Sequence, residues 1–362
     1  MPGHSVVVVG FSAGGVEAMA RLAAGLPRDL PAAVFVAHHF PGNSVSALPS
    51  ILRRSGHLPA LHPAHNQQIE PGRIYVAPPD RHMLIVKNRI HLSRGPRENG
   101  HRPAIDPLFR SAATTFGPRV IGVLLSGALD DGSVGMMAVK EHGGTAIVQD
   151  PGEALYVGIP EGAIRRDAVD HILIVEEIAQ LLTRLTREAV ALQEGSLAML
   201  PEDQEYLDPA QAGTAAIDKS SLLGHPTGLT CPDCGGAIWE SVNGDLVRYR
   251  CHVGHAYTAD SMVGAQASAV ETALWTAVRA LEEKAELSRR LAERSRRRGI
   301  NRLAGKYQAA VENAERGSDA IRQLLLSGTA EPPSSGGSET DEPEEPEEPA
   351  GWPAEATGME RM

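Results

Sequence analysis

A serine in a glycine-rich turn is the first candidate for chemistry in this sequence. The valine run VVVV (6–9) leads into GFSAGG (10–15), after which apolar residues recur every three to four positions. This order is typical of a strand, a tight turn and a helix. The G-x-S-x-G pattern around Ser12 has the form of a nucleophile elbow, in which small neighbours expose a serine hydroxyl. A structural alternative stays open, since serine at this position is also a normal helix N-cap.

A phosphate-binding loop is the competing interpretation of the same turn. A dinucleotide-binding loop needs G-x-G-x-x-G after the first strand, but Ser12 stands where the middle glycine belongs. The second strand of such a fold usually ends in an acid that binds ribose, whereas the second candidate strand here ends in His38-His39. The turn also lacks the G-K-[ST] of a Walker loop. The pattern therefore favours a nucleophile over a nucleotide-binding loop.

Histidine and aspartate pairs follow two other candidate strands. His38 and His39 end one of them, and Asp130 and Asp131 follow another. In open α/β sheets the carboxyl ends of the strands meet along one edge. A serine, a histidine base and a carboxylate that orients the imidazole are what a serine hydrolase needs. The order Ser–His–Asp, with only eleven residues before the serine, differs from the Ser–Asp–His order of the ordinary α/β-hydrolases.

Alternating strands and helices must position these side chains. Short β-branched runs, typical of strands buried on both faces, predict strands at 5–10, 33–38, 73–77, 83–86, 89–92, 119–126, 144–149 and 169–175. Helices are predicted at 14–25, 44–55, 106–116, 133–142, 160–166 and 176–193. The two strands within 83–92 are predicted to form a hairpin. Residues 1–193 are therefore expected to be a three-layer α/β/α domain with a mostly parallel, doubly wound sheet.

Three cysteines in one short stretch define a second candidate site. Cys231-x-x-Cys234 presents two thiolates to one metal ion, and Cys251 supplies a third. The fourth ligand is His252 or His255, of which His255 is favoured because the chain must curl back to the ion. Three cysteines and one histidine close a tetrahedron, so the sequence predicts a structural zinc rather than a catalytic one. The alternative is three reduced cysteines without a metal.

The C-terminal half of the chain is predicted to have four parts. An interruption at Arg296-Arg297-Arg298-Gly299 divides the helical part into two helices that form a hairpin, with the arginines as a solvated helix end. The parts are a linker at 194–226, a zinc-ribbon-like module at 227–260 whose hairpin turns at Asn243-Gly244, a helical segment at 261–328 and a disordered acidic tail at 329–362.

Charge and hydropathy exclude several classes of protein. The net charge is −11, and residues 329–362 hold ten acidic residues and one arginine, so the rest of the chain is nearly neutral. There is thus no electrostatic case for nucleic-acid binding. The N-terminus lacks a basic n-region, no apolar run has the length of a membrane span, and three clustered cysteines do not suggest disulfides. We expect a soluble, cytoplasmic protein without membrane insertion.

Six collinear segments resemble the catalytic domain of the chemotaxis protein-glutamate methylesterases, the CheB family. They cover about residues 5–185 and read GFSAGG, AHHFPG, RIYVAPPDRHM, IDPLFRSAA, LLSGALDDGSVGM and QDPGEALYVGIPEGAI. The catalytic residues of that family match Ser12, His39 (which precedes Phe40-Pro41) and Asp131 (which precedes a glycine).

The resemblance implies an activity and a substrate. The implied reaction is hydrolysis of glutamate γ-methyl esters on chemoreceptors, with release of methanol and no catalytic cofactor, together with deamidation of glutamine side chains. Two neighbours stay open as alternatives to the matched residues: His38 in place of His39 as base, and Asp130 in place of Asp131. The non-catalytic interpretation of Asp130 is an N-cap of the helix predicted from residue 133.

The chain also departs from the family pattern. It begins directly at the catalytic strand, so we expect no receiver domain and no phosphorylation control in cis. Ala13 follows the serine where the family often has threonine, and GALDDG (127–132) replaces G-M-G-x-D-G. These changes keep open a catalytically weak or inactive CheB-like binding or regulatory protein. Tails similar to CPDCGG…RCxVGHAY occur on some proteins of this family, and this one is expected to dock a signalling kinase or regulator.

Eight further histidines have no comparable partners in the sequence. They are expected to lie on the surface or to pack in the core, namely His57, His62, His65, His82, His91, His101, His142 and His171.

Overall fold

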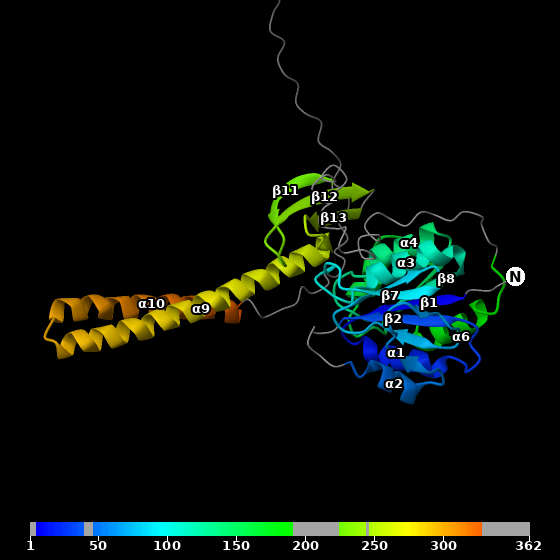
Figure 1. The fold of residues 1–362 in the computed structure, drawn as a ribbon, viewed down its shortest axis with the longest axis horizontal. Coiled ribbons are helices and arrows are strands. Elements are labelled where there is room, and N and C mark those ends of the chain that lie inside the picture. The colour runs from blue at the N-terminus through cyan, green and yellow to red at the C-terminus, as the bar shows by residue number, and fades with distance from the viewer. Residues whose placement is uncertain (1–4, 40–45, 191–223, 244–245, 328–362) are drawn as a thin grey trace, which may run out of the picture. The chain divides into compact units, whose positions relative to one another are not determined.

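The structure, a computed structural model, describes residues 5–39, 46–190, 224–243 and 246–327 (Figure 1). The chain divides into two compact units, Met1–Thr272 and Ala273–Met362. The predicted α/β domain and the cysteine-containing segment therefore belong to the same unit. Most of the predicted linker and all of the predicted acidic tail lie outside the described residues.

Seven parallel strands form the central sheet, in the order β10-β9-β8-β1-β2-β5-β3. Strand β1 lies in the middle and pairs in parallel with β2 on one side and with β8 on the other. The chain therefore winds outward from β1 in both directions, which confirms the predicted doubly wound sheet. The strands are β1 (Val6–Phe11), β2 (Ala33–His38), β3 (Ala60–Leu61), β5 (Ile74–Val76), β8 (Val120–Leu124), β9 (Thr145–Gln149) and β10 (His171–Leu173).

Helices cover both faces of this sheet, as predicted (Figure 1). One face packs against α1 (Gly15–Gly25), α2 (Leu48–Ser55) and α6 (Val175–Leu185). The other face packs against α3 (Ile105–Phe116), α4 (Ser133–Glu141) and α5 (Gly158–Arg165). A single 3₁₀ turn, η1 (Gly117–Arg119), links α3 to β8.

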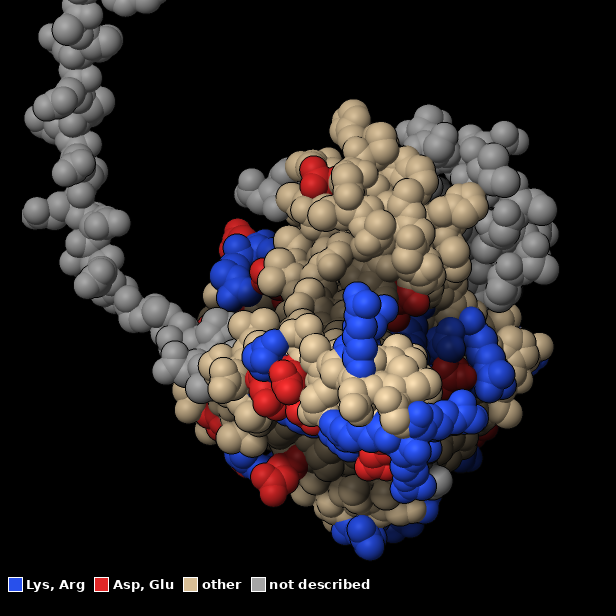
Figure 2. Space-filling view, turned by 90° about the vertical axis from the view of Figure 1, so that its left-hand side faces the viewer, with Lys and Arg blue, Asp and Glu red and all other residues tan. Residues whose placement is uncertain are grey.

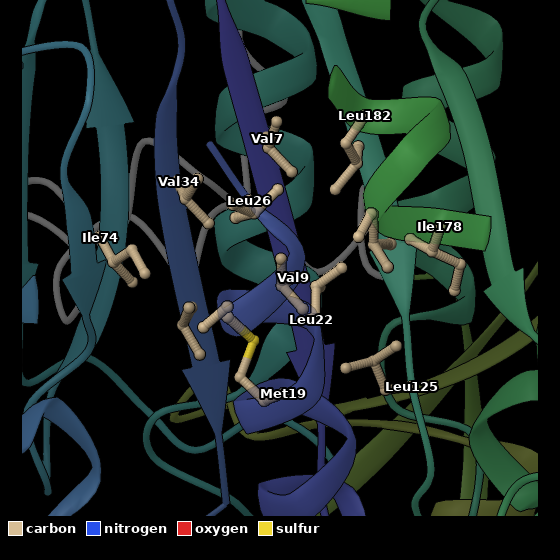
Figure 3. Packing of buried hydrophobic residues seen from close by; sticks show 14 of the residues in the cluster. Val7, Val9, Met19, Leu22, Leu26, Val34, Ile74, Leu125, Ile178 and Leu182 are labelled. Atoms are coloured by element: carbon tan, nitrogen blue, oxygen red, sulfur yellow. The ribbon is translucent and has the colours of Figure 1, made fainter. Parts of the chain in front are cut away.

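The valines of β1 show why this strand is apolar at every position. Val7 and Val9 point into the cluster under α1, while Val6 and Val8 point into the cluster under α3. Figure 3 shows Val7 beside Leu26 and Val9 beside Leu22 in the first cluster. Burying each side chain contributes about 1.5–3 kcal/mol, so the run anchors the start of the Ser12 turn from both sides.

A small second sheet has the order β4-β7-β6, with β4 before β5 in the chain and the other two strands after it. Its strands are β4 (Gln67–Gln68), β6 (His82–Val86) and β7 (Arg89–Ser93). The pairing of Val86 with Arg89 confirms the predicted hairpin in this segment. The two-residue strands β3 and β4 were not predicted, because two residues carry no readable periodicity.

A four-stranded antiparallel sheet contains the cysteines, in the order β11-β12-β13-β14. Its strands are β11 (His225–Thr230), β12 (Ala237–Asn243), β13 (Leu246–Cys251) and β14 (Ala256–Thr258). Asn243 pairs with Leu246, so β12 and β13 form a hairpin. The two residues between them, including Gly244 of the predicted turn, lie outside the described residues.

Two long helices follow, α9 (Ala259–Arg297) and α10 (Asn301–Ser327), and the break between them falls at the predicted basic segment. They form an antiparallel hairpin, since Arg296 bonds to Gln308 and Arg289 to Glu315. The core between them is small, with Ala285, Val311 and Ala314 buried.

The turn end of this hairpin carries exposed arginines, Arg294, Arg296, Arg297, Arg298 and Arg302. Figure 2 shows basic and acidic side chains interspersed on one face of the molecule. The exposure of these arginines agrees with the predicted solvated helix end. Neither of these helices, nor any other within the described ranges, is long and apolar enough to span a membrane.

Candidate active site

Three neighbouring strands of the central sheet bring the predicted site residues together. Ser12 directly follows β1, His39 directly follows β2, and Asp131 lies in the loop between β8 and α4. Because β2 and β8 flank β1 and run parallel to it, their carboxyl ends lie at the same edge of the sheet. This edge is where open α/β sheets form their sites.

The Ser12 turn is held by the backbone of the neighbouring loop. The N–H of Ser12 donates to the carbonyl oxygen of Ser126 at 3.0 Å, and the Ser126 hydroxyl donates to the carbonyl of Ala13 at 2.9 Å. Gly14, not Ser12, is the N-cap of α1, and its φ of 73° lies in the left-handed region that favours glycine. Ser12 itself does not have a positive φ. The expected nucleophile elbow is therefore a relaxed turn with its left-handed position two residues after the serine.

His39 connects Ser12 to Asp131. Its Nδ1 lies 3.0 Å from the Ser12 hydroxyl oxygen, and its Nε2 lies 2.6 Å from Oδ2 of Asp131. The side chains of His39 and Asp131 are buried, at 7% and 1% exposure. An ionised carboxylate only accepts hydrogen bonds, so the neutral imidazole carries its proton on Nε2 and offers the Nδ1 lone pair to the serine.

The Asp131 carboxylate receives further hydrogen bonds from the chain. The N–H groups of Ile105 and Asp106, at the start of α3, donate at 2.8 and 3.3 Å, and the Asn99 amide donates at 2.8 Å. Burial alone would raise the pKa of Asp131, but the hydrogen bonds from His39, Ile105 and Asn99 outweigh it and lower the pKa below its usual value. The carboxylate is thus ionised at neutral pH, as a residue that orients an imidazole must be.

Both neighbouring alternatives lie elsewhere in the structure. The ring of His38 packs against Phe11 with centroids 4.8 Å apart, and burial, with the adjacent His39, lowers its pKa to about 4. The Asp130 carboxylate binds Arg166 at 2.7 Å and the Thr258 hydroxyl at 2.6 Å. Asp130 does not cap α4 with its side chain, because the N-cap there is Gly132 at φ 98°.

A tight turn at Glu98–His101 borders the site and was not predicted. Asn99 and Gly100 both have positive φ, at 52° and 76°, and Glu98 and His101 exchange two backbone hydrogen bonds. The His101 ring stacks on His39 with centroids 3.6 Å apart, and burial, together with His39, lowers the pKa of His101 to about 3. A sequence signal for this turn existed, since Asn-Gly is the strongest short hairpin signal.

Asp106 neighbours Asp131, to which its backbone N–H donates, and the two side chains differ in charge. Asp106 is fully buried, and this burial, with the negative charges of Asp131 and Glu98, raises its pKa well above the usual value. A protonated Asp106 avoids placing two adjacent carboxylate charges in a dry site. Its Oδ1 accepts a hydrogen bond from the N–H of Gly135 at 2.6 Å.

His82, near this site, makes the stability of the fold depend on pH. Its Nε2 donates to the carbonyl of Pro96 at 2.9 Å and its Nδ1 accepts the N–H of Ala104 at 3.3 Å. Burial lowers its pKa from 6.5 to about 4. Between these values the unfolded chain binds a proton that the folded chain does not, so the free energy of unfolding falls as pH falls from 6.5 towards 4. At about 1.36 kcal/mol per pKa unit, we expect a loss of roughly 2 kcal/mol from this residue at pH 5.

Urea unfolding at pH 7 and pH 5 measures this loss. The variant His82→Gln should show a smaller difference between the two pH values, although His38 and His101 also titrate low and leave part of it. The control is His57→Gln, because His57 is exposed. A pH difference that is equal in His82→Gln and the wild type would contradict the prediction.

The cysteine segment forms a compact ligand cluster. The Sγ atoms of Cys231, Cys234 and Cys251 and a ring nitrogen of His255 lie within 4.8 Å of one another. Cys234 Sγ lies 3.7 Å from Cys251 Sγ, and His255 Nδ1 lies 3.6 and 3.5 Å from Cys231 Sγ and Cys251 Sγ. A zinc ion with Zn–S bonds of about 2.3 Å separates its ligands by about 3.8 Å in a tetrahedron. The cluster therefore has the donor set and the spacing that zinc requires, whereas His252 is exposed outside it.

Comparisons with known proteins match the N-terminal half of the chain. The model of the CheB methylesterase family matches residues 7–182. A putative protein-glutamate methylesterase/protein-glutamine glutaminase of Leptospira interrogans is 37% identical over 183 residues, which are 50% of this chain and 95% of that protein. The protein-glutamate methylesterase/protein-glutamine glutaminase 2 of Methanosarcina mazei is 34% identical over 192 residues, 51% of this chain and 52% of that protein. The crystal structure of the Thermotoga maritima CheB methylesterase catalytic domain is 29% identical, with a TM-score of 0.48 over 50% of this chain and 98% of that one.

The family match and the relatives from Leptospira and Methanosarcina define a carboxylic ester hydrolase. The chain belongs to the CheB methylesterase family. The expectation drawn from its six sequence segments is thereby confirmed.

Proposed function

We propose that this protein is a serine-type protein-glutamate methylesterase that hydrolyses glutamate γ-methyl esters on chemoreceptors in the cytoplasm, and that it also deamidates glutamine. The observation that supports this most directly is the hydrogen-bonded chain Ser12–His39–Asp131, with contacts of 3.0 and 2.6 Å. The names of the relatives supply the substrate chemistry.

In the proposed mechanism Ser12 is the nucleophile and His39 the base. The Ser12 hydroxyl attacks the ester carbonyl while Nδ1 of His39 takes its proton. The protonated imidazole then gives this proton to the departing methoxide, which leaves as methanol. A water molecule, activated by the same nitrogen, hydrolyses the acyl-enzyme and restores the serine. Asp131 keeps the imidazole in the required tautomer and balances its charge.

Backbone N–H groups beside Ser12 are suited to stabilise the tetrahedral oxyanion. Among the described residues, no acceptor pairs with the N–H groups of Ala13 and Gly14. They lie at the N-terminus of α1, where the helix dipole favours negative charge. Replacing threonine by Ala13 leaves such backbone donors in place, so this departure from the family pattern does not favour the inactive alternative.

The substrate assay uses receptor membranes with radiolabelled methyl esters. We expect the wild-type protein to release labelled methanol from them, and to release none after mild alkali has removed the esters. A fluorophosphonate, which reacts with activated serines, should add its mass to the peptide containing Ser12 in the native protein but not in the urea-unfolded protein. Absence of both methanol release and labelling would overturn the proposed activity.

We also propose that Cys231, Cys234, Cys251 and His255 hold one structural zinc ion. The ligand spacing supports this, and with three cysteines and one histidine the coordination is closed. When bound, the ion would cross-link the segment before β12 to both ends of the turn that precedes β14. The proposal assigns the metal to the fold and not to ester hydrolysis.

Removal of a ligand should therefore remove the metal. We expect one zinc per chain in the purified wild type by elemental analysis, and less than about a tenth of that in His255→Gln, because three ligands hold zinc far more weakly than four. The matched control is His252→Gln, in which the neighbouring histidine lies outside the cluster. Equal zinc content in His255→Gln and wild type would contradict the assignment.

The C-terminal part is further proposed to dock a signalling kinase or regulator. Its long, solvent-exposed helices α9 and α10 offer a surface for such a partner, with exposed apolar side chains at Val270, Trp275 and Leu287.

A further inference from the structure

The Asn99 side chain uses both of its N–H donors and its carbonyl oxygen in hydrogen bonds. Its Nδ2 donates to Asp131 at 2.8 Å and to Asp106 at 3.0 Å. Its Oδ1 accepts the backbone N–H of Thr258 at 3.0 Å. The residue is 4% exposed, so water does not compete well for these groups. Only one of the two orientations of the amide donates to both carboxyl groups and accepts the Thr258 N–H.

Thr258 belongs to β14, far from the family-matched segment 7–182 in sequence. The strand lies along the Glu98–His101 turn: the N–H of Asn99 donates to the carbonyl of Ala256 at 2.7 Å, and the N–H of Ala256 donates to the carbonyl of Arg97 at 3.3 Å. β14 is thus the edge partner of the turn that carries Asn99.

Side chains also connect the cysteine-containing sheet to residues on the two sides of Asp131. Arg248 of β13 binds the buried carboxylate of Glu98 at 2.8 Å, beside the bidentate pair that Glu98 makes with Arg110. On the other side, Asp130 accepts hydrogen bonds from the hydroxyls of Thr258 at 2.6 Å and Ser261 at 3.1 Å. The cysteine-containing sheet therefore contacts the residue before Asp131 and the amide that bonds to Asp131.

We propose that Asn99 is a positioning residue for the Asp131 carboxylate, and that the backbone N–H of Thr258 holds Asn99 in the orientation that this requires. The sheet β11–β14 then completes the active site from outside the catalytic half. Without the Thr258 N–H, the amide is free to turn its oxygen toward Asp131, which repels the carboxylate and releases His39. This inference rests on the proposed function of Ser12, His39 and Asp131.

The experiment compares full-length variants by two readouts, methanol release and the rate of Ser12 labelling by a fluorophosphonate. Labelling of Ser12 needs no receptor. Its rate therefore tests the positioning role of Asn99 even if the proposed substrate is wrong. For Asn99→Ala we expect kcat and the labelling rate to fall about ten- to hundredfold, as when outer partners of metal ligands are lost. KM should change less than about threefold, since Asn99 reaches the substrate only through Asp131.

Two substitutions of Thr258 isolate its backbone N–H. Thr258→Pro removes the N–H and the hydroxyl, whereas Thr258→Val removes the hydroxyl alone. We expect Thr258→Pro to lower the labelling rate about as much as Asn99→Ala does, and Thr258→Val to lower it less than about threefold. Adding Thr258→Pro to Asn99→Ala should cause little further loss, because both act on the same contact.

Arg248→Met serves as the independent variant if Thr258→Pro does not fold, as judged by circular dichroism and melting. It weakens the attachment from β13, and we expect a loss of about three- to tenfold that disappears in the Asn99→Ala background. Wild-type labelling by Asn99→Ala would overturn the positioning role. Losses that multiply in the double variants would overturn the coupling to β14.

Discussion

Ser12→Ala should abolish ester hydrolysis. We expect methanol release to fall by at least about a thousandfold, because loss of the nucleophile in a Ser–His–Asp enzyme leaves only binding and oxyanion stabilisation. The substitution removes the contact between the serine side chain and His39. The fold should survive, because the turn itself is held by a backbone hydrogen bond to Ser126. The measurement is methanol release from methylated receptor membranes, with circular dichroism to establish equal folding.

Ser50→Ala is the control for this substitution. Ser50 lies exposed on α2, where its hydroxyl oxygen accepts a hydrogen bond from Arg53, and its loss should leave methanol release unchanged. Full activity in Ser12→Ala would mean that another group attacks the ester, and the mechanism derived from the 3.0 Å contact would have to be abandoned.

His39→Gln should lower the rate of ester hydrolysis almost as much as Ser12→Ala does. The neighbouring residue His38 supplies a matched comparison. We expect kcat to fall about 10³- to 10⁴-fold in His39→Gln, because glutamine cannot take the serine proton. His38→Gln should stay within about tenfold of wild type. The reason is that His38 packs against Phe11 and is held neutral by burial, which lowers its pKa to about 4.

Steady-state kcat and KM for both variants decide between the two histidines. KM should be little changed in His39→Gln, since the imidazole acts on the serine and not on the bound receptor. If His38→Gln were the inactive variant and His39→Gln the active one, the order of roles at the end of β2 would be reversed.

The sheet and its helices could be predicted because each buried strand is a continuous apolar run. Residues 5–10 were expected as a strand and β1 is Val6–Phe11; the helix expected at 106–116 is α3 at Ile105–Phe116. The predicted helix ends were less accurate where no capping residue indicates the end of the helix. The last helix of the α/β domain was expected at 176–193, but α6 ends at Leu185.

The part of the candidate site that lies at the carboxyl ends of the strands could be predicted from the sequence. Ser12, His39 and Asp131 could be placed on one rim from the topology, and the resemblance selected them from their neighbours. Asn99 and His101 were missed, although Asn-Gly is a turn signal, because their contacts join the turn to residues 32 and 62 positions away in the chain. The contact of Thr258 with Asn99 spans 159 positions, and no local pattern encodes a pairing of that length.

The orientation of the His39 ring has a consequence for spectroscopy. In the serine-protease arrangement the nitrogen that faces the aspartate is Nδ1, whereas here it is Nε2, 2.6 Å from Asp131. A short hydrogen bond to a carboxylate deshields its proton, so the most downfield proton resonance of the native protein should correlate with the ¹⁵N of Nε2. Isotope labelling at a single ring nitrogen would thus distinguish this imidazole from that of a protease, even though both hold the same three residue types.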